Sequence, residues 1–338
     1  MCSTLTHRIS TPSRLHFTLI DMNGESGRID GSLGLATQNP RVLLEFGPHG
    51  RTVVRGGSTA ERELILAEIA AAGEILDVEP GIEILIRQMI PPHQGLGSGT
   101  QTRLAVLSAL SHRLGLNHSP REIGAMSSRG GTSGIGINAF RCGGILLDGG
   151  HSVREQKGAF APSHFATKAG QPPLLLRNDF PTNWGIALFI PSRQRGLSGQ
   201  DELDFMLANT PIPLEEVQSA CHIILMRLLP ALLELDLETF GSSVSALQDV
   251  GWKRRHWARP DIEPLQSVRF AFDATAGIKG CGLSSTGTTV FGFFDRTTVS
   301  DDEMTAGLRR ELSDKRAIPG RIVCTRANNS GMHLTSVA

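Results

Sequence analysis

Residues 91–101 read PPHQGLGSGTQ, and this stretch is the most informative in the 338-residue chain. Its glycines at 95, 97 and 99 free the backbone to turn several N–H groups toward one ligand. A helical pattern follows at once, with leucines spaced by three and four between residues 104 and 114. The unpaired amides and positive end of such a helix attract anions. The stretch therefore predicts a phosphate-binding loop; the alternative is a tight structural turn.

The elements expected around this loop place it between a strand and a helix. Residues 81–89 alternate side chains as a strand does, and residues 101–114 have helical spacing. A further helix is expected over 59–72, and a second glycine-rich stretch, RGGTSGIG, occupies 129–136. No Gly-Lys-Ser or Gly-Lys-Thr closes the first loop, and its glycines do not have GxGxxG spacing. A Walker A loop and a dinucleotide-binding fold are thus excluded.

The remaining pattern favours an α+β protein. Short strand-like runs and turns fill the first 58 residues, and residues 151–172 form a polar excursion. Helical patterns dominate after an apolar run at 184–190. At roughly 150 residues per domain the length suggests two domains. We expect the boundary near residue 180, which gives units 1–180 and 181–338.

Composition narrows the class of protein. Lys plus Arg and Asp plus Glu both number 33, so no net charge draws the chain toward nucleic acid or a membrane surface. The five cysteines form no CxxC pair, which argues for a reducing compartment and against structural zinc. The N-terminal residues lack the apolar run of a signal peptide, and the apolar stretch 223–237 is too short and interrupted for a membrane span. We expect a cytoplasmic protein with neither nucleic-acid nor membrane partners.

The PxxxGLGS pattern at 91–98 resembles the phosphate-binding motif of the GHMP superfamily of galactokinase, homoserine, mevalonate and phosphomevalonate kinases. Within that superfamily the chain is most similar to the β-ribofuranosylaminobenzene 5'-phosphate synthases. Five segments carry the likeness in order over nearly the whole chain: RLHFTLIDMNGESGRIDGSLGLA from Arg14, PPHQGLGSGTQ from Pro91, RGGTSGIGINAF from Arg129, GGILLDGGH from Gly143 and GLSSTGTTVFGF from Gly282.

This resemblance implies a fold and a reaction. The fold is a ribosomal-S5-like N-terminal domain joined to a ferredoxin-like C-terminal domain. The reaction condenses 4-aminobenzoate, or a close benzoate analogue, with phosphoribosyl pyrophosphate and releases CO2 and pyrophosphate, in the pterin branch of methanopterin biosynthesis and so in one-carbon metabolism. The resemblance further implies Mg²⁺ or a similar cation, no organic cofactor, and a homodimer as the possible assembly. It leaves an amino- or hydroxybenzoate acceptor open.

Two departures from the kinase pattern argue against phosphoryl transfer. Many GHMP kinases have an Asp that takes the proton of the accepting hydroxyl, and Gly136 stands at that place here. A positioned base contributes roughly 10² to 10⁴ in rate. Gly99 also replaces the second serine of the kinase GLGSS loop. An ATP-dependent small-molecule kinase is the alternative function, and a catalytically silent ligand sensor on the same scaffold is a third.

The two hydroxyl-lined glycine segments are the expected phosphate contacts. We assign the donor's phosphates to Gly95, Leu96, Gly97, Ser98, Gly99 and Thr100, together with Ser284, Ser285 and Thr286. Ser98 and Thr100 are the candidate metal contacts, because Gly99 removes the second serine hydroxyl of the kinase loop and leaves these two hydroxyls beside it.

Charged residues in three segments are the catalytic candidates: Arg14, His16, Asp21, Arg129, Asp148 and His151. The first three share a segment with Arg28 and Asp30, whose mixed charges suit a benzoate carboxylate, a ribose or a metal. A surface salt-bridge network is the alternative there. The Arg129 guanidinium can donate two parallel hydrogen bonds to a carboxylate or phosphate. Asp148 and His151 flank a Gly-Gly turn. There they either contact a metal or substrate, or only form hydrogen bonds within the turn.

A last cluster, WKRRHWARP over Trp252 to Pro260, interleaves basic residues with tryptophans. Such a pattern occurs on nucleic-acid surfaces. On a neutral chain a solvated helix end or a wall of the phosphate pocket fits it better. The eleven histidines have no HExxH spacing, which argues against a tight zinc site.

Overall fold

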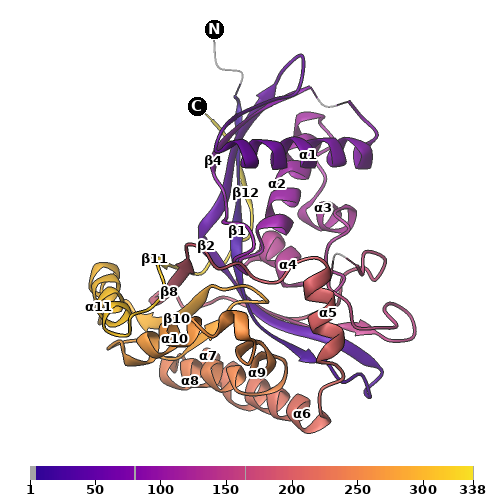
Figure 1. The fold of residues 1–338 in the computed structure, drawn as a ribbon. Coiled ribbons are helices and arrows are strands. Elements are labelled where there is room, and N and C mark those ends of the chain that lie inside the picture. Colours follow the sequence, from indigo (N-terminus) through magenta and orange to yellow (C-terminus); the bar gives the residue numbers. More distant parts are fainter. Residues whose placement is uncertain (1–4, 80, 164, 338) are drawn as a thin grey trace.

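The computed structural model describes residues 5–79, 81–163 and 165–337, which form two β-sheets arranged along the long axis of the molecule (Figure 1). The chain passes from the larger sheet to the smaller between β7 (Leu174–Asn178) and β8 (Trp184–Pro191). The last strand, β12 (His333–Ser336), returns to the larger sheet and pairs with β1 (His7–Asp21), so both termini lie at one end. The expected unit 181–338 therefore gives its final strand to the first sheet.

A long antiparallel hairpin of β1 and β2 (Arg28–Pro48) forms the centre of the larger sheet. One half of β2 pairs with β4 (Ile82–Gln88), and the other half pairs with β5 (Ile145–Asp148) and β6 (His151–Ser152). The short parallel strand β3 (Val53–Gly56) forms the edge beyond β4. Strands and turns do fill the first 58 residues as expected, but β1 and β2 are far longer than the short runs that were predicted. The Asp30-Gly31 pair, both at positive φ, lies within β2 instead of ending it.

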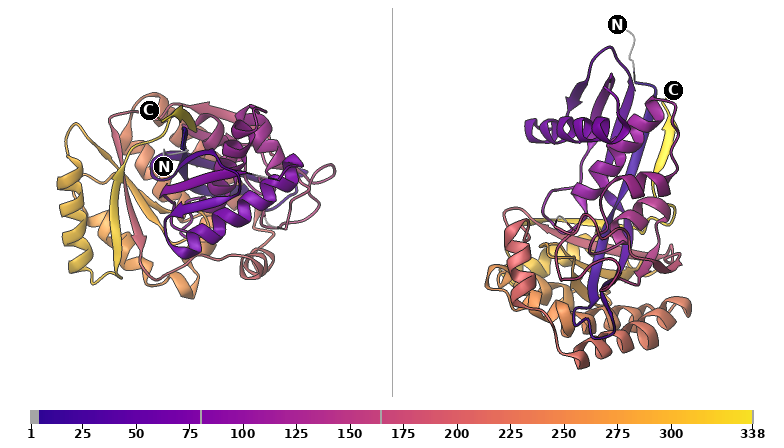
Figure 2. Two further views of the ribbon diagram at one scale, coloured as in Figure 1. Left: turned by 90° about the horizontal axis from the view of Figure 1, so that it is seen from above. Right: turned by 90° about the vertical axis from the view of Figure 1, so that its right-hand side faces the viewer.

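Helices cover one face of this sheet (Figures 1 and 2). The helix expected over 59–72 is α1, which begins after a Ser58–Glu61 capping box that satisfies its first amides. The helix expected over 101–114 is α2, and the strand expected over 81–89 is β4, so these expectations are confirmed. The helices on this face are α1 (Thr59–Leu76), α2 (Ser98–Arg113), α3 (Pro120–Met126) and α4 (Ile135–Cys142).

The smaller sheet is antiparallel, with strand order β11-β8-β10-β9. Helices connect β8 to β9 and β10 to β11, which is the βαββαβ arrangement of a ferredoxin-like unit. The strands are β9 (Cys281–Leu283), β10 (Val290–Asp295) and β11 (Gly320–Thr325), and the helices are α5 (Gln200–Ala208), α6 (Leu214–Ile223), α7 (Leu229–Leu233), α8 (Leu237–Gln248), α9 (Gly251–Trp257), α10 (Leu265–Ala274) and α11 (Asp301–Asp314).

One hydrophobic core runs through both sheets and fixes them relative to each other. Phe17 on β1 stacks on Phe291 of β10, with ring centroids 5.2 Å apart. The run Leu214–Leu233, which includes a π-helical turn, has the length and apolar composition of a membrane span. Its residues Ile224 and Leu228 are buried in this same core, as in a core helix of a globular domain.

Candidate active site

A cavity of about 610 Å³ opens where the two sheets meet. Its wall combines the 95–100 loop, β1, the segment before α4, residues 197–206, α9 and the 285–287 loop. This volume is typical of a small-molecule site. The glycine-rich segments predicted to bind phosphate thus come to a single cavity.

The two glycine loops are in direct backbone contact. Gly95 has a φ of 75°, and a Cβ there would overlap the carbonyl oxygen of Ser284 and lie 2.9 Å from the Cα of Gly287. Beside this contact, the backbone N–H and hydroxyl of Thr289 both donate to the carbonyl of Gln94, at 3.3 and 2.7 Å. These contacts of residues 94–95 with residues 284–289 form a seam, which holds the glycine loop of the larger sheet against that of the smaller sheet.

The loop leads directly into α2 and leaves its first amides available. Gly97, at a φ of 80°, precedes the helix, and no side chain caps it. The amides of Ser98, Gly99 and Thr100 belong to the first turn, where a helix has no internal acceptors. All three residues line the cavity. The arrangement can bind an anion through backbone N–H groups and the helix dipole.

Two arginines lie beside these amides. The Arg14 guanidinium donates to the carbonyl of Gly95 and packs against Gly97. Burial lowers the pKa of Arg14 to about 10, and the nearby Glu202 opposes this shift. The Arg129 guanidinium lies beside Gly99, and its buried Nε has no partner among the described residues. Burial, with Arg103 nearby, also lowers the pKa of Arg129.

A second basic group faces the cavity from the smaller sheet's side. Lys253 on α9 is 1% exposed, and its Nζ donates to the carbonyls of Leu283 and Ser285 at 2.5 and 2.8 Å. His16 on β1 is 6% exposed, and its Nδ1 has no partner among the described residues. Burial lowers the pKa of both groups, and the neighbouring cations reinforce the effect.

A side chain at the place of the kinase base would press on Thr100. Gly136 lines the cavity, and a Cβ there would lie 3.3 Å from the Thr100 methyl group. Among the described lining residues Glu202 is the one carboxylate, and it accepts a hydrogen bond from the Thr286 hydroxyl at 3.0 Å. Residue 136 therefore supplies no base for an alcohol, and a Cβ there would require a small shift of Thr100.

The structure brings most of the predicted site residues to the cavity. The residues that line it are Gly95, Gly97, Ser98, Gly99, Thr100, Ser285 and Thr286, with Arg14, His16 and Arg129. The predicted residues that do not line it are Leu96, Ser284, Asp21, Asp148 and His151. The lining also contains residues that the sequence analysis did not select, among them Thr132, Ser133 and Glu202. Thr132 and Ser133 lie in the quoted RGGTSGIG stretch, whereas no motif marks Glu202.

Ser284 supports the loops from behind. Its hydroxyl donates to the carbonyl of Gly95 at 2.7 Å and accepts from the backbone N–H of His16 at 3.1 Å. The side chain is fully buried. Ser284 therefore joins β1 to both glycine loops, and it does not line the cavity at which the phosphate contact was predicted.

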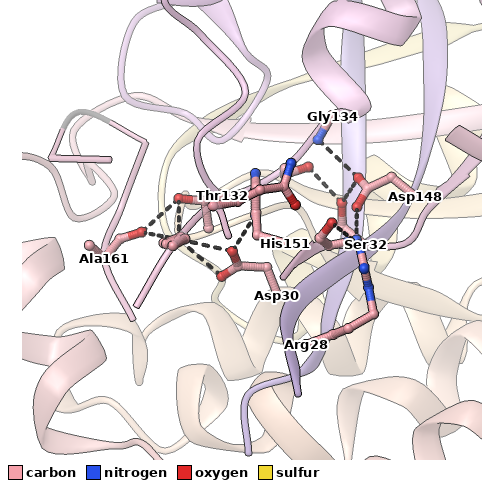
Figure 3. Close-up of polar contacts among 12 residues, drawn as sticks. Arg28, Asp30, Ser32, Thr132, Gly134, Asp148, His151 and Ala161 are labelled. Carbon is pink, nitrogen blue, oxygen red and sulfur yellow. Dashed lines mark hydrogen bonds and ion pairs between the residues drawn. The ribbon is translucent and has the colours of Figure 1, made fainter. Parts of the chain in front are cut away.

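Asp148 and His151 belong to buried networks beside the cavity (Figure 3). Asp148 accepts from the backbone N–H groups of Gly134 and Gly150 at 2.9 and 3.1 Å, and from the Ser32 hydroxyl. Burial raises the pKa of Asp148 to about 6 despite these donors. Asp148 thereby fixes the start of α4, and it does not line the cavity where its catalytic role was predicted.

His151 pairs with a carboxylate instead of facing substrate. Its Nδ1 lies 2.7 Å from an oxygen of Asp30, which also accepts from the Lys157 Nζ at 2.9 Å. The same ammonium donates to the carbonyl of Ala161 at 2.7 Å, next to the cavity-lining Pro162. Figure 3 shows these contacts converging beside Thr132. The network holds the 157–163 segment as part of the cavity wall.

Asp21 caps the tip of the β1–β2 hairpin. Its carboxylate accepts from the backbone N–H groups of Asn23 and Gly24 and from the Ser26 hydroxyl. Asp21, predicted as a catalytic candidate, thus forms the turn and is absent from the cavity lining.

Replacing Lys157 by Met is expected to lower the free energy of unfolding by about 3 kcal/mol, because the buried Asp30 carboxylate loses its ammonium partner. Chemical denaturation measures this change. Lys168→Met, in the same 151–172 excursion but exposed, is the matched control and should change stability by less than about 0.5 kcal/mol. Equal stability of the two variants would show that the Asp30 pair does not hold the segment.

The side chains at the cavity suit a metal ion that arrives with a substrate. Within the described part of the chain, no three His, Cys, Asp or Glu side chains are arranged to hold an ion. The cavity offers the Ser98 and Thr100 hydroxyls and the Glu202 carboxylate. Mg²⁺ usually keeps several waters and binds substrate phosphates with few protein ligands. This donor set fits such an ion.

Known proteins resemble the chain in sequence and in fold. Residues 62–144 match the family model of the GHMP kinases N terminal domain. A protein of Archaeoglobus fulgidus named beta-ribofuranosylphenol 5'-phosphate synthase is 39% identical, with 97% of this chain and 99% of that protein covered. Proteins of the same name from Methanothermobacter thermautotrophicus and Methanocaldococcus jannaschii are 38% and 34% identical, with 96% of this chain and 97% and 98% of those proteins covered.

Solved structures share the fold at low identity. A homoserine kinase from Listeria monocytogenes, described as putative, has a TM-score of 0.64 and 18% identity, with 97% of this chain and 99% of that one covered. The L. major mevalonate kinase has a TM-score of 0.64 and 13% identity, with 95% and 96% covered. At such identities the likeness shows the fold, which is the α+β fold expected from the sequence.

Proposed function

Because the chain belongs to the beta-ribofuranosylphenol 5'-phosphate synthase family, whose fold is that of the GHMP kinases, we propose that it joins a phosphoribosyl group to an aromatic ring. The donor is phosphoribosyl pyrophosphate and the acceptor a para-substituted benzoate. The ring carbon that bears the carboxylate bonds to the ribose C1, and the C1–oxygen bond to pyrophosphate breaks. The bond to the carboxylate then breaks, CO2 leaves, and its electron pair restores the aromatic ring.

One observation carries this proposal. The cavity offers hydrogen-bond donors for a polyanion, namely the first-turn amides of α2 and the Arg129 guanidinium. It has no carboxylate at residue 136. A glycosyl transfer of this kind needs a held leaving group and oriented partners more than it needs a base for an alcohol. The residues present suit that demand better than they suit phosphoryl transfer.

The relatives' names support a choice of the acceptor's para group. Those names describe a ribofuranosylphenol product, which requires a hydroxyl on the ring. We therefore propose a hydroxybenzoate as acceptor, with the aminobenzoate named in the sequence analysis as the alternative. The reaction would belong to methanopterin assembly in the cytoplasm.

The leaving pyrophosphate would carry a divalent cation such as Mg²⁺, which neutralises the charge that develops on it. Ser98 and Thr100 would contact this ion from the loop, and the Ser98 and Gly99 amides would bind phosphate oxygens. Arg129 would hold the donor against α2. The chain's own part is thus binding and orientation, and the reaction requires no organic cofactor.

A kinase is the second candidate, favoured by the kinase identity of the neighbours in fold. One experiment separates the two. The protein is incubated with Mg²⁺, phosphoribosyl pyrophosphate and hydroxy- or aminobenzoate, and in parallel with ATP and small alcohols; the products are identified by mass spectrometry. We expect a ribosyl phenol phosphate from the first mixture. ATP turnover without use of the phosphoribosyl donor would overturn the proposal.

A further inference from the structure

The WKRRHWARP cluster contributes two neighbouring residues, Trp252 and Lys253, to the cavity wall. The other charged members of the cluster have acidic partners: Arg254 and Arg255 pair with Glu216, and Arg259 pairs with Asp261. Lys253 has none among the described residues, although it is almost completely buried. The function proposed above does not use it.

The charged side chains that act on Lys253 are basic, and Glu202, the one carboxylate among the described lining residues, hydrogen-bonds to Thr286 instead. The side chains close enough to shift its pKa downward, after burial itself, are Arg14 and Arg259. His16 adjoins the same group, with an unpartnered Nδ1. Two backbone carbonyls accept from the Lys253 Nζ, and an ammonium has a third N–H to donate. A buried ammonium is costly without a counter-charge, and a bound anion would supply one.

Apolar side chains adjoin this basic end. Leu19, Met206 and Trp252 line the cavity, belong to one hydrophobic cluster and are nearly buried. They come from β1, α5 and α9, so the fold itself assembles them beside His16 and Lys253. A flat apolar ring fits such walls, and an ionised group on the ring fits the basic end.

We propose that these residues form the acceptor site for an aromatic carboxylate. The carboxylate lies against Lys253 and His16, and the ring lies along Leu19, Met206 and Trp252. This inference rests on the proposed function, because it divides the cavity between two substrates. The donor occupies the Ser98–Thr100 amides and Arg129, and the acceptor's carboxyl-bearing carbon approaches from the Arg14 side, where the two regions meet.

Benzoate and benzamide test this assignment, since they share shape and differ in charge. Each is titrated calorimetrically into the intact protein, with Mg²⁺ and inorganic pyrophosphate present to fill the donor loop. The native protein should bind benzoate at least about tenfold more tightly than benzamide, as a charge-assisted hydrogen bond implies. In Lys253→Met this preference should fall to about one- to twofold.

Arg254→Met is the matched control, because it removes one positive charge from the adjacent, exposed position on α9. It should keep the benzoate preference of the native protein. If Lys253→Met does not fold, the titration of the native protein still tests the site. A preference for benzoate over benzamide below about threefold, or no benzoate binding, overturns the acceptor site. Displacement of benzoate by pyrophosphate would assign Lys253 to the donor and likewise overturn it.

The outcome is separable from that of the proposed function, because the titration requires no turnover. A protein that binds benzoate through Lys253 but forms no ribosyl product contradicts the synthase reaction and leaves the carboxylate site standing. A protein that forms the product, with a benzoate preference that Lys253→Met does not change, contradicts the site alone.

Discussion

Gly95→Ala is expected to reduce synthase turnover by more than about 100-fold. The added Cβ would overlap the Ser284 carbonyl oxygen and crowd Gly287, so the two glycine loops would have to separate. Displacement of reacting groups by about 1 Å can cost about 10² in rate. Steady-state kinetics of product formation measures the loss. A calorimetric titration with inorganic pyrophosphate should show weaker binding to the displaced loop.

The matched control for this change is Gly115→Ala. Gly115 has nearly the same left-handed φ, 72° against 75°, but a Cβ there meets nothing within 4 Å. Both variants carry the same backbone strain, and only Gly95→Ala adds a collision. If Gly115→Ala lost as much activity as Gly95→Ala, the effect would come from strain and not from the seam between the loops.

Arg129→Met should raise the KM for phosphoribosyl pyrophosphate by about 10- to 100-fold. The guanidinium makes no ion pair within the described chain, so its removal takes a charge-assisted contact from the donor without breaking an internal one. Kinetics with the donor varied at saturating acceptor measures the effect. Arg129→Lys should recover only part of it, because an ammonium cannot fork two phosphate oxygens.

Stability and acceptor binding are the internal controls for Arg129. We expect an unfolding midpoint close to that of the native protein and an unchanged KM for the benzoate. Arg121→Met, at an exposed position on α3, should alter neither KM. A change in the acceptor KM with an unchanged donor KM would place Arg129 at the other substrate and contradict the assignment.

The glycine loop before α2 could be predicted from sequence because its signal is local. Gly95, Gly97 and Gly99 stand beside the helix they precede, and the structure keeps them together at the cavity. Arg14 and Arg129 were predicted through segments distant in sequence, and the fold brings both to this loop. Their charge and their glycine neighbours were the available signals.

Asp148 and His151 show why sequence alone did not place every candidate at the cavity. A carboxylate and an imidazole beside a glycine turn look the same in sequence whether they face substrate or a buried partner. Here the partners are the Gly134 amide for Asp148 and Asp30 for His151, which lie 14 and 121 residues away. Long-range pairing decides such cases. Glu202 was missed for the related reason that α5 carries no motif, and only packing places it at the cavity.

The long β1–β2 hairpin was not predicted, because a local turn signal within β2 indicated that the strand ends there. Asp30-Gly31 is a common turn pair, yet pairing of β2 with β1, β5 and β6 keeps the strand continuous through it. The elements with strong periodicity, such as α1 and β4, were predicted close to their bounds. Tertiary pairing thus overrode local propensity where the strand was longest.

A crystal structure with phosphoribosyl pyrophosphate and Mg²⁺ tests the central claim most directly. We predict the diphosphate at the first-turn amides of Ser98, Gly99 and Thr100 with Arg129 on its oxygens, and the ribose C1 turned toward Arg14. Density for the donor away from both glycine loops, or a preference of this site for a nucleoside triphosphate, would contradict the account.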